Sequence, residues 1–525
     1  MCGIFALVFK DKFDIEKKSD YEEAFGNISH RGPDYSILTV VNDKCIFGFH
    51  RLSVNDVSED GNQPFVQNDR VTMVNGEIYN HEDLKNVYDL DTKGGSDCEV
   101  VGLLLNKLFR MNVFEQLDGV FAGVSVKGNS VVAFRDPIGI RPLFYVETDE
   151  FIGFASEAKA LVPLSKNEVK IFPIGKYWCD GIFTDYCFPY NFRNTSPLNT
   201  DTLRHLLIQS VEKRVKNCDR ELGFFLSGGL DSSLVACIAN NLMPDKTINT
   251  FSIGMDVNSP DLRYAAHVAY KIKSNHHEVI FSLEEGISAI KDVIYQCETY
   301  DCTTIRASIP MYLLSKYIKK QTDVRVVLSG EGADELFGGY LYFHNAPSVD
   351  EFTVETERLI NNVHMFDGLR ADRATAAWGL EVRVPFFDRN LISYIRSLHG
   401  DVKMPSCTGV EKFILRSAFD GYPNIPSNVL WRQKDAFSDA VGYSWVSTLK
   451  SITEGNVTDF EFNNRHDMFP EDTPQTKEDY YYRVIYNDIY GNKSLGSKGK
   501  WLPKWVGDIK DPSATYLKVH TCSKV

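Results

Sequence analysis

The second residue of the chain is a cysteine that could act as a nucleophile. If Met1 is removed, as a small second residue permits, Cys2 gains a free α-amine with a pKa of about 8 beside a thiol with a pKa of about 8.5. The amine can then accept the thiol proton, directly or through a water, so this nucleophile needs no separate histidine. It would attack carbonyl carbons, including those of amides. Judged by position alone, Cys2 is more often an inert small apolar residue.

Three further segments of the first hundred residues carry groups that suit an amide substrate. In MVNGEIYNH, we predict that Asn75 and Gly76 form a turn at a strand end, where an amide and a backbone N–H could hold a developing oxyanion. In isolation an ordinary hairpin turn is the more common interpretation. Arg51 in HRLSV suits a carboxylate and Asp97 in GGSDCE suits an α-ammonium group, although either alone is usually a solvated charge. With Cys2, they describe a site for the side-chain amide of an amino acid such as glutamine.

The second half of the chain contains a candidate phosphate site. ELGFFLSGGLDSSLVACIAN places a glycine-rich turn between an apolar strand and a helix, where N–H groups and hydroxyls can bind phosphate. The segment lacks the GK[ST] of a Walker loop, and its Asp231 could hold Mg²⁺ against the phosphates. The alternative is a serine-rich helix N-cap. Further on, the strand VRVVL precedes Glu331, Asp334 and Glu335, which are either a solvated loop or ligands for a metal or substrate at a strand end.

The elements expected to position these groups differ between the two halves. Short strands are predicted over 45–54, 71–79, 120–126, 130–136, 142–147 and 151–157, with helices over 21–28 and 97–111. The apolar run after Cys2 suits a strand buried on both faces. From about residue 200, longer helices alternate with apolar strands over 221–227, 247–255 and 323–330, which is typical of an α/β domain with a parallel sheet. The polar stretch 191–200 is the predicted linker.

Composition limits the class of protein. A chain of 525 residues, 43% hydrophobic, exceeds what one hydrophobic core usually organises, so we expect at least two domains. The net charge of -14 argues against a nucleic-acid partner. Eleven cysteines without a CxxC pair indicate reduced thiols and a cytoplasmic location. The sequence has no secretory signal and no run of about 18 apolar residues, so we expect no membrane association.

Motifs of the first half resemble, in order and spacing, the class II glutamine amidotransferase domain, an N-terminal-nucleophile (Ntn) hydrolase. These motifs are MCGI, HRGPD, HRLSV, NGEIYNH, SDCE, LDGVFAG and RDPIGIRPLFY, and they cover nearly all of residues 2–185. The resemblance implies that Cys2 attacks the glutamine amide, forms a thioester and releases ammonia. It also implies that Asn75 and Gly76 form the oxyanion hole and that Arg51, Asn75, Gly76, Glu77 and Asp97 bind glutamine.

Motifs of the second half are similar to those of glutamine-dependent asparagine synthetases, which contain an ATP-pyrophosphatase-type domain. They include SGGLDSS, FSIGM, ETYDCTTIRASIPMYL, SGEGADELFGGYLYFHNAP, LRADRATAAWGLEVRVPFFD, EKFILR and LWRQKDAFSDAVGYSW. The residues that would bind ATP on this resemblance are Leu226, Ser227, Gly228, Gly229, Asp231, Ser232, Ile253, Ser329 and Gly330. Glu331 would promote adenylate formation, and Thr303, Thr304, Arg306, Asp334 and Lys434 would handle aspartate or the adenylate. Arg306 and Lys434 could instead be surface salt-bridge partners. We expect Asp231, Asp334 and Glu335 as Mg²⁺ ligands.

The resemblance also implies the fold and the domain boundaries. We expect an α+β Ntn hydrolase sandwich followed by an α/β domain with a parallel sheet, of the adenine nucleotide alpha hydrolase-like type. The predicted divisions are 2–188 for the glutaminase domain, 189–200 for the linker, 201–490 for the synthetase domain and 491–525 for a C-terminal tail. The tail, including SKGKWLPKW, matches the family pattern poorly. A homodimer, as in many members of the family, is possible.

The expected reaction joins the two halves. Aspartate and MgATP would form a β-aspartyl adenylate and pyrophosphate, and ammonia from glutamine would then displace AMP to give asparagine. An apolar channel between the domains would keep the ammonia from water. Two alternatives are an enzyme that amidates or cyclises another carboxylate, as β-lactam synthetases do, and an inactive homologue that acts as a binding protein. The first class commonly loses the nucleophilic cysteine, and the second would be expected to lose Cys2, Asp231 or Glu331, all of which are present.

Overall fold

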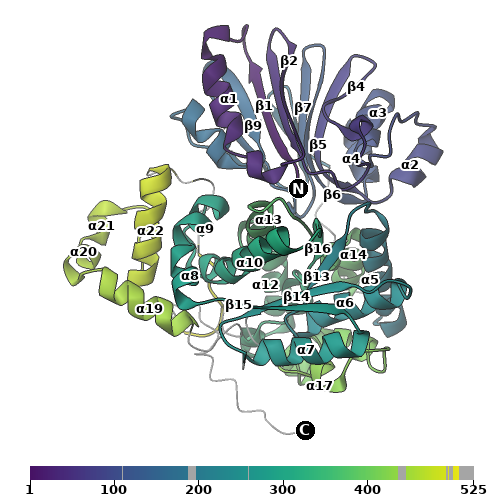
Figure 1. The fold of residues 1–525 in the computed structure, drawn as a ribbon, viewed down its shortest axis with the longest axis vertical. Helices are drawn as coiled ribbons and strands as arrows, with labels where there is room; N and C mark the ends of the chain where they lie inside the picture. The colour runs from purple at the N-terminus through teal and green to yellow at the C-terminus, as the bar shows by residue number, and fades with distance from the viewer. Residues whose placement is uncertain are drawn as a thin grey trace.

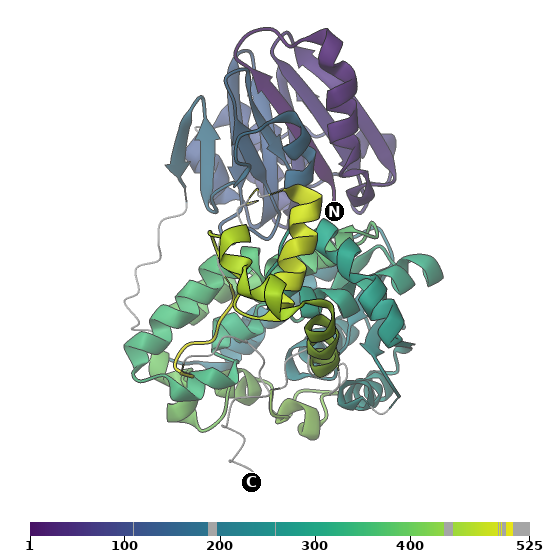
Figure 2. The same ribbon diagram turned by 90° about the vertical axis from the view of Figure 1, so that its left-hand side faces the viewer.

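The protein folds into two lobes (Figure 1). The computed structural model describes residues 1–108, 110–186, 197–257, 259–434, 445–491, 493, 495 and 500–507. We call residues 1–186 the N-terminal lobe and residues 197–507 the C-terminal lobe. The chain begins at the junction of the two lobes, in both Figure 1 and Figure 2. Most of the predicted linker, and most of the predicted tail, lie outside the described residues.

The N-terminal lobe contains two antiparallel sheets, each of six strands, in the orders β10-β8-β9-β1-β3-β2 and β12-β11-β7-β6-β5-β4. The strands are β1 (Gly3–Phe9), β2 (Tyr35–Asn42), β3 (Cys45–Arg51), β4 (Phe65–Gln67), β5 (Arg70–Ile78), β6 (Gly119–Lys127), β7 (Ser130–Arg135), β8 (Phe144–Glu147), β9 (Phe151–Ala155), β10 (Lys170–Ile171), β11 (Lys176–Cys179) and β12 (Ile182–Asp185). The helices are α1 (Lys18–Gly26), α2 (His81–Tyr88), α3 (Glu99–Lys107) and α4 (Arg110–Gln116).

The two sheets pack face to face between helical layers. One buried cluster joins residues of β1 and β3 to residues of β5, β6 and β7, and therefore fills the space between the sheets. The outer face of the second sheet packs against α2, α3 and α4, and α1 covers the first sheet (Figure 1). The predicted Ntn hydrolase sandwich is thus confirmed. This arrangement buries both faces of each sheet.

Strand β1 is buried on both faces, as its apolar sequence predicts. Ile4 and Ala6 point into the core between the sheets, whereas Phe5 and Leu7 belong to a second cluster that includes α1. The strand pairs with β3 on one side and β9 on the other. Because Cys2 directly precedes this central strand, its backbone position is set by pairing on both sides.

The prediction that Asn75 and Gly76 form a turn is wrong. Both residues lie inside β5, where they pair with Ala122 and Phe121 of β6. The glycine is required by close approach of the strands and not by a turn. A Cβ atom at Gly76 would lie 2.2 Å from the carbonyl oxygen of Val120.

The C-terminal lobe is built on a five-stranded sheet with the order β15-β14-β13-β16-β17, in which every pairing is parallel. Its strands are β13 (Leu222–Phe225), β14 (Asn249–Gly254), β15 (Asn275–Ile280), β16 (Val326–Leu328) and β17 (Glu381–Arg383). Its helices are α5 (Thr200–Lys216), α6 (Leu230–Leu242), α7 (Pro260–Ile272), α8 (Leu283–Ser288), α9 (Ile290–Cys297), α10 (Cys302–Gln321), α11 (Ala333–Phe337), α12 (Val349–Asn362), α13 (Asp367–Ala376), α14 (Arg389–Ser397), α15 (Pro405–Thr408), α16 (Phe413–Ala418), α17 (Ser427–Leu430), α19 (Trp445–Asn456), α20 (Asp459–Asn463), α21 (Arg465–Met468) and α22 (Lys477–Tyr490).

The parallel sheet confirms the predicted α/β fold, and its carboxyl edge gathers the glycine-rich loops. The turn between β13 and α6 contains Gly228 at a φ of 73°, a conformation that glycine adopts without strain. At the end of β16, a Cβ atom on Gly330 would lie 2.7 Å from the backbone nitrogen of Ser232. Glycine therefore lets the two loops approach each other. None of the helices in the described part of the chain is long and apolar enough to cross a membrane.

A cluster of buried charges joins the two lobes. We call it the interlobe charge cluster, and its members are Arg31, Glu157 and Lys159 of the N-terminal lobe with Glu298, Asp372 and Arg373 of the C-terminal lobe. The guanidinium of Arg31 lies 2.6 Å from Glu157 and 2.8 Å from Asp372. Arg373 lies 2.7 Å from Glu157 and 2.9 Å from Glu298. Three basic and three acidic side chains therefore balance in an interior where an unpaired charge is costly.

We predict that Arg373→Met lowers the free energy of unfolding by about 3 to 5 kcal/mol, because it leaves buried Glu157 and Glu298 short of a partner. Urea denaturation followed by tryptophan fluorescence measures this loss. The control is Lys18→Met, which removes an exposed pair with Glu22 and should cost less than about 0.5 kcal/mol. Equal losses for the two variants would contradict the role given to the cluster.

Candidate active sites

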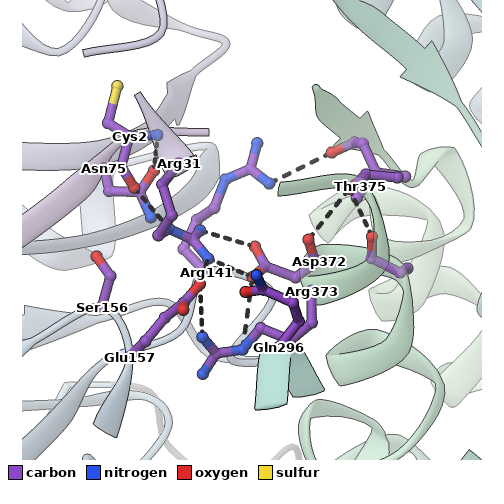
Figure 3. A network of polar contacts seen from close by, with 12 residues as sticks. Cys2, Arg31, Asn75, Arg141, Ser156, Glu157, Gln296, Asp372, Arg373 and Thr375 are labelled. Atoms are coloured by element: carbon purple, nitrogen blue, oxygen red, sulfur yellow. Dashed lines mark hydrogen bonds and ion pairs between the residues drawn. The ribbon is translucent and has the colours of Figure 1, made fainter. Parts of the chain in front are cut away.

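The backbone of Cys2 is held by two side chains of the N-terminal lobe (Figure 3). Its backbone N–H donates to Asn75 Oδ1 at 2.9 Å, and its carbonyl oxygen accepts from Arg31 Nε at 2.9 Å. The Cys2 sulfur points away from the charged side chains in Figure 3. Asn75 Nδ2 is buried and has no hydrogen-bond partner. This amide N–H is thus available to an oxygen beside the thiol, as the sequence prediction for an oxyanion hole requires.

Burial changes the ionisation of the chain terminus and of the thiol beside it. Burial lowers the pKa of the Met1 α-amine from 8.0 to about 6. The same burial raises the pKa of the Cys2 thiol, an effect that the charge of the terminus partly opposes. The Met1 amine is therefore mostly neutral near pH 7 and able to accept a proton.

Arg51 lies near Cys2, and the following loop holds its guanidinium. Its Nη1 donates to the carbonyl of Ser58 at 2.7 Å and to Asn62 Oδ1 at 2.8 Å, and its Nη2 donates to the carbonyl of Asp56. The loop thus fixes the direction in which this guanidinium presents its remaining N–H groups. Fixed geometry is what bidentate capture of a carboxylate needs.

Glu77 and Asp97, the two acids predicted for the glutamine site, contact residues of the C-terminal lobe. Asn217, which follows α5, donates its side-chain amide to Glu77 Oε2 at 2.8 Å and to Asp97 Oδ2 at 3.4 Å. Arg383 of β17 lies 2.8 Å from Glu77 and donates to the carbonyl of Asn217 at 2.6 Å. The sequence analysis missed Asn217 and Arg383, because more than a hundred residues separate each from the acids it contacts.

Most of the nucleotide-site residues predicted in the C-terminal lobe line one cavity of about 210 Å³. The predicted residues in its lining are Leu226, Ser227, Gly229, Asp231, Ser232, Ile253, Thr303, Arg306, Ser329, Gly330, Glu331, Asp334 and Lys434. Gly228 lies within the same loop, whereas Thr304 and Glu335 are outside the lining. The cavity therefore sits at the carboxyl ends of β13, β14 and β16, where parallel sheets bind ligands.

Two lysines face the predicted metal ligands. Lys412 Nζ lies 2.6 Å from Asp231 and 2.6 Å from Asp334, and Lys434 Nζ lies 2.6 Å from Asp334. These cations hold the pKa of Asp334 well below its usual range, although burial opposes them. Lys412 was not predicted, although it lies in the EKFILR motif. Two ammonium groups beside a glycine-rich turn supply the positive charge that a polyphosphate needs.

Glu331 is paired with Arg370, another residue that the sequence analysis missed. Arg370 Nη2 lies 2.7 Å from Glu331 and 2.9 Å from Asp367. Burial raises the pKa of Glu331, and the charge of Arg370 opposes this change. The pairing favours an ionised carboxylate in the wall of the cavity.

The three residues predicted from TTIRAS occupy different environments. Thr303 lines the cavity, and its hydroxyl is buried without a partner. Thr304 instead lies in the first turn of α10, where its N–H and hydroxyl donate to the capping residue Asp301 at 2.8 and 2.7 Å. Arg306 lines the cavity but donates two hydrogen bonds to Glu478, at 2.8 and 2.5 Å. Of the three, Thr303 has a hydrogen-bonding group available to a substrate, and Thr304 is structural.

Glu335, the third predicted metal ligand, lies outside the cavity lining. Its carboxyl group accepts a hydrogen bond from Tyr340 at 2.6 Å, and Tyr340 also contacts Asp367 at 3.0 Å. Burial and the nearby Asp367 and Asp334 raise the pKa of Glu335 well above its usual range. Among the described residues, no three acidic, histidine or cysteine side chains come together as a metal site. The structure therefore does not gather Asp231, Asp334 and Glu335 as a three-ligand cage.

Comparisons with known proteins match nearly the whole chain. The family model described as a glutamine amidotransferase domain matches residues 1–188, and the model described as asparagine synthase matches residues 202–356 and 346–506. An asparagine synthetase [glutamine-hydrolyzing] from Zea mays is 40% identical over 99% of this chain and 94% of its own length. The protein of the same name from Gallus gallus is 41% identical over 99% of both chains. The solved structure of an amidotransferase from B. subtilis aligns with 63% of this chain and with 81% of its own chain, at 13% sequence identity and a TM-score of 0.31.

Glu335→Gln tests whether this buried acid is a protonated partner of Tyr340 or a metal ligand. The raised pKa of Glu335 means that its contribution to stability is greatest below about pH 4.5 and is lost as the pH rises through the folded-state value. The neutral variant should therefore gain stability over the wild type at about pH 8 and gain none at about pH 4, in denaturation measured at both values. The KM for MgATP should stay within about twofold, whereas a rise of about tenfold or more would indicate a lost metal ligand.

Proposed function

The chain belongs to the glutamine-hydrolysing asparagine synthetase family, and we propose that its two sites carry the two halves of that reaction. The protein is a carbon–nitrogen ligase that makes asparagine with glutamine as nitrogen donor and ATP as co-substrate. The site at Cys2 releases ammonia, and the cavity of the C-terminal lobe activates aspartate. The observation that carries the assignment is that one side chain ties Cys2 to a helix of the cavity wall. Arg31 binds both the carbonyl of Cys2 and the carboxylate of Asp372 in α13, the helix that also supplies Asp367 and Arg370 to the cavity.

The glutaminase half requires removal of Met1. The Cys2 α-amine then takes the thiol proton, and the thiolate attacks the side-chain amide carbon of glutamine. Asn75 Nδ2 and the Gly76 N–H stabilise the oxyanion, the amine returns the proton to the departing ammonia, and water hydrolyses the thioester to glutamate. Burial lowers the pKa of the Met1 α-amine to about 6, and the same buried junction would favour a neutral, proton-accepting amine on Cys2 once Met1 is removed.

Substrate binding at this site uses fixed charges. Arg51, held by its loop, binds the α-carboxylate of glutamine, and Glu77 and Asp97 bind the α-ammonium group. Asn217 and Arg383 position the two acids from the other lobe. Glutamine binding therefore depends on how the lobes are docked.

The synthetase half begins with phosphate binding at the turn before α6. Ser227, Gly229 and Ser232 bind the phosphates that leave as pyrophosphate, and Lys412 and Lys434 exchange their carboxylate partners for phosphate oxygens. The β-carboxylate of aspartate attacks the α-phosphorus, which forms the adenylate and releases pyrophosphate. Glu331 then accepts a proton as ammonia attacks the β-carbonyl and AMP leaves. Thr303 supplies a free hydroxyl to the aspartyl group.

A magnesium ion fits this site if it arrives with the nucleotide. Asp231 Oδ1 is buried without a hydrogen-bond partner, and Asp231 and Asp334 both pair with Lys412. Mg²⁺ in nucleotide sites usually takes one or two carboxylates, with phosphate oxygens and waters as its other ligands. Asp231 and Asp334 would hold the ion, which would neutralise phosphate charge.

The two halves must be connected through the interior, because ammonia that enters water becomes mostly ammonium. A single cluster of buried apolar side chains continues across the lobe boundary. Its members near the boundary include Met1, Leu52, Val120, Ile138 and Ile140 of the N-terminal lobe and Leu226, Leu380, Val382 and Val384 of the C-terminal lobe. We take this cluster as the wall of an ammonia path. An apolar wall excludes water and offers ammonia no proton.

We also propose a cytoplasmic setting. Every cysteine in the described part of the chain is a free thiol. Thiols persist in reducing compartments, where disulfides are rare.

Cys2→Ser separates the two activities. The variant should lose glutamine-dependent asparagine synthesis by at least about a hundredfold, because an alcohol is a poorer nucleophile than a thiol at neutral pH. Asparagine synthesis from ammonium should stay within about twofold of the wild type, since Cys2 takes no part in adenylation. Mass spectrometry of the products measures both. Loss of both activities, or of neither, would contradict the assignment.

A further inference from the structure

We propose that Trp501, in the C-terminal segment, is a wall of the aspartyl-adenylate site that keeps water from the activated carbonyl. The inference rests on the proposed function and assigns a residue outside the motifs that define it. The segment is residues 500–507, within the tail that matched the family pattern poorly. Trp501 lines the cavity of the C-terminal lobe, and its side chain is 9% exposed.

Two ion pairs, ring packing and a backbone hydrogen bond anchor this segment. Lys500 lies 2.5 Å from Asp479 of α22, and Lys504 lies 3.0 Å from Glu355 of α12. The ring of Trp505 packs on Tyr342 and Phe343, with centroids 5.9 and 6.2 Å apart. The backbone N–H of Trp501 donates to Asp301 Oδ1 at 3.0 Å. The segment thus ties helices that are far apart in the sequence to one edge of the cavity.

The bond to Asp301 places Trp501 at the start of α10. Asp301 Oδ2 caps this helix by accepting from Thr304, and Thr303, which directly precedes Thr304, lines the cavity with a hydroxyl that has no partner. One carboxylate therefore fixes both the helix start and the tryptophan backbone. This edge of the cavity is the one proposed for aspartate.

The ring of Trp501 also packs on Tyr340, which is linked to Glu331 through two further side chains. Its centroid lies 5.2 Å from that of Tyr340, whose hydroxyl contacts Asp367 at 3.0 Å. Asp367 pairs with Arg370, which in turn pairs with Glu331. A large apolar surface thus stands beside the charged groups expected to act on the adenylate.

An apolar wall at this place has a chemical purpose. The aspartyl adenylate has two competing fates, since ammonia gives asparagine and AMP, whereas water returns aspartate and AMP. The second path converts ATP and water into AMP and pyrophosphate with no asparagine. Water is far more concentrated than ammonia, so the site must exclude it. The ring of Trp501 supplies a large apolar surface that can exclude water here.

The test measures pyrophosphate formed per asparagine in the full-length protein with aspartate, MgATP and ammonium. The wild type should give a ratio close to unity. Trp501→Ala should raise the ratio at least about threefold, and Trp501→Phe should restore most of the coupling, because an aromatic ring still covers the site. The matched control is Trp505→Ala, which removes a tryptophan from the same segment that does not line the cavity, and which should leave the ratio near unity.

The outcomes separate the inference from the proposed function. If the wild type forms asparagine and Trp501→Ala keeps a ratio near unity, the inference is wrong and the proposed function stands. Equal increases in Trp501→Ala and Trp505→Ala would also overturn it, since they would assign the effect to anchoring of the segment. A wild type that forms no asparagine would overturn both. Glutaminase activity of each preparation reports that the N-terminal lobe is folded.

Discussion

Buried charge at the boundary between the lobes is the constraint on which both sites depend. The six members of the interlobe charge cluster are almost fully buried, so each must find an opposite charge, and the partners come from both lobes. Separating or sliding the lobes would expose apolar surface and would leave charges without partners. A single docked arrangement is therefore strongly favoured. Arg31 connects the cluster to the nucleophile, because the same guanidinium that binds Asp372 also binds the carbonyl of Cys2.

A second connection passes through the short strand β17. The side chain of Arg383 reaches Glu77 in the N-terminal site, while its backbone carbonyl accepts from the N–H of Ser329 at the edge of the nucleotide cavity. One residue therefore touches a glutamine-site acid with its side chain and an ATP-site loop with its backbone. If a ligand at either site displaces β17, the contacts of Arg383 at the other site change as well. Two sites that act in sequence need such a physical connection.

Local sequence patterns predicted which residues belong to each site better than they predicted the contacts that those residues make. The apolar run after Cys2, the glycine-rich turn before α6 and the acids after β16 each carry a local signal, and the structure places these segments as expected. The turn assigned to Asn75 and Gly76 failed, because close approach of β6, and not a change of chain direction, requires that glycine. The sequence predicted the same metal-binding role for Asp334 and Glu335. Their different positions depend on the fold, because Glu335 is buried beside Tyr340 and only Asp334 faces the cavity. Asn217, Arg383, Lys412 and Trp501 act on residues far away in the sequence, and only the folded chain brings them together.

The central claim is that the two sites share an interior, so that ammonia released at Cys2 reaches the adenylate without entering solution. The most direct measurement supplies glutamine labelled with ¹⁵N at its amide together with an excess of unlabelled ammonium, and follows the isotope in asparagine by mass spectrometry. The account predicts that asparagine keeps nearly the ¹⁵N fraction of the glutamine amide, whatever the concentration of ammonium in solution. A ¹⁵N fraction that falls to that of the bulk ammonia pool would show that the nitrogen mixes with solvent, and would contradict the claim.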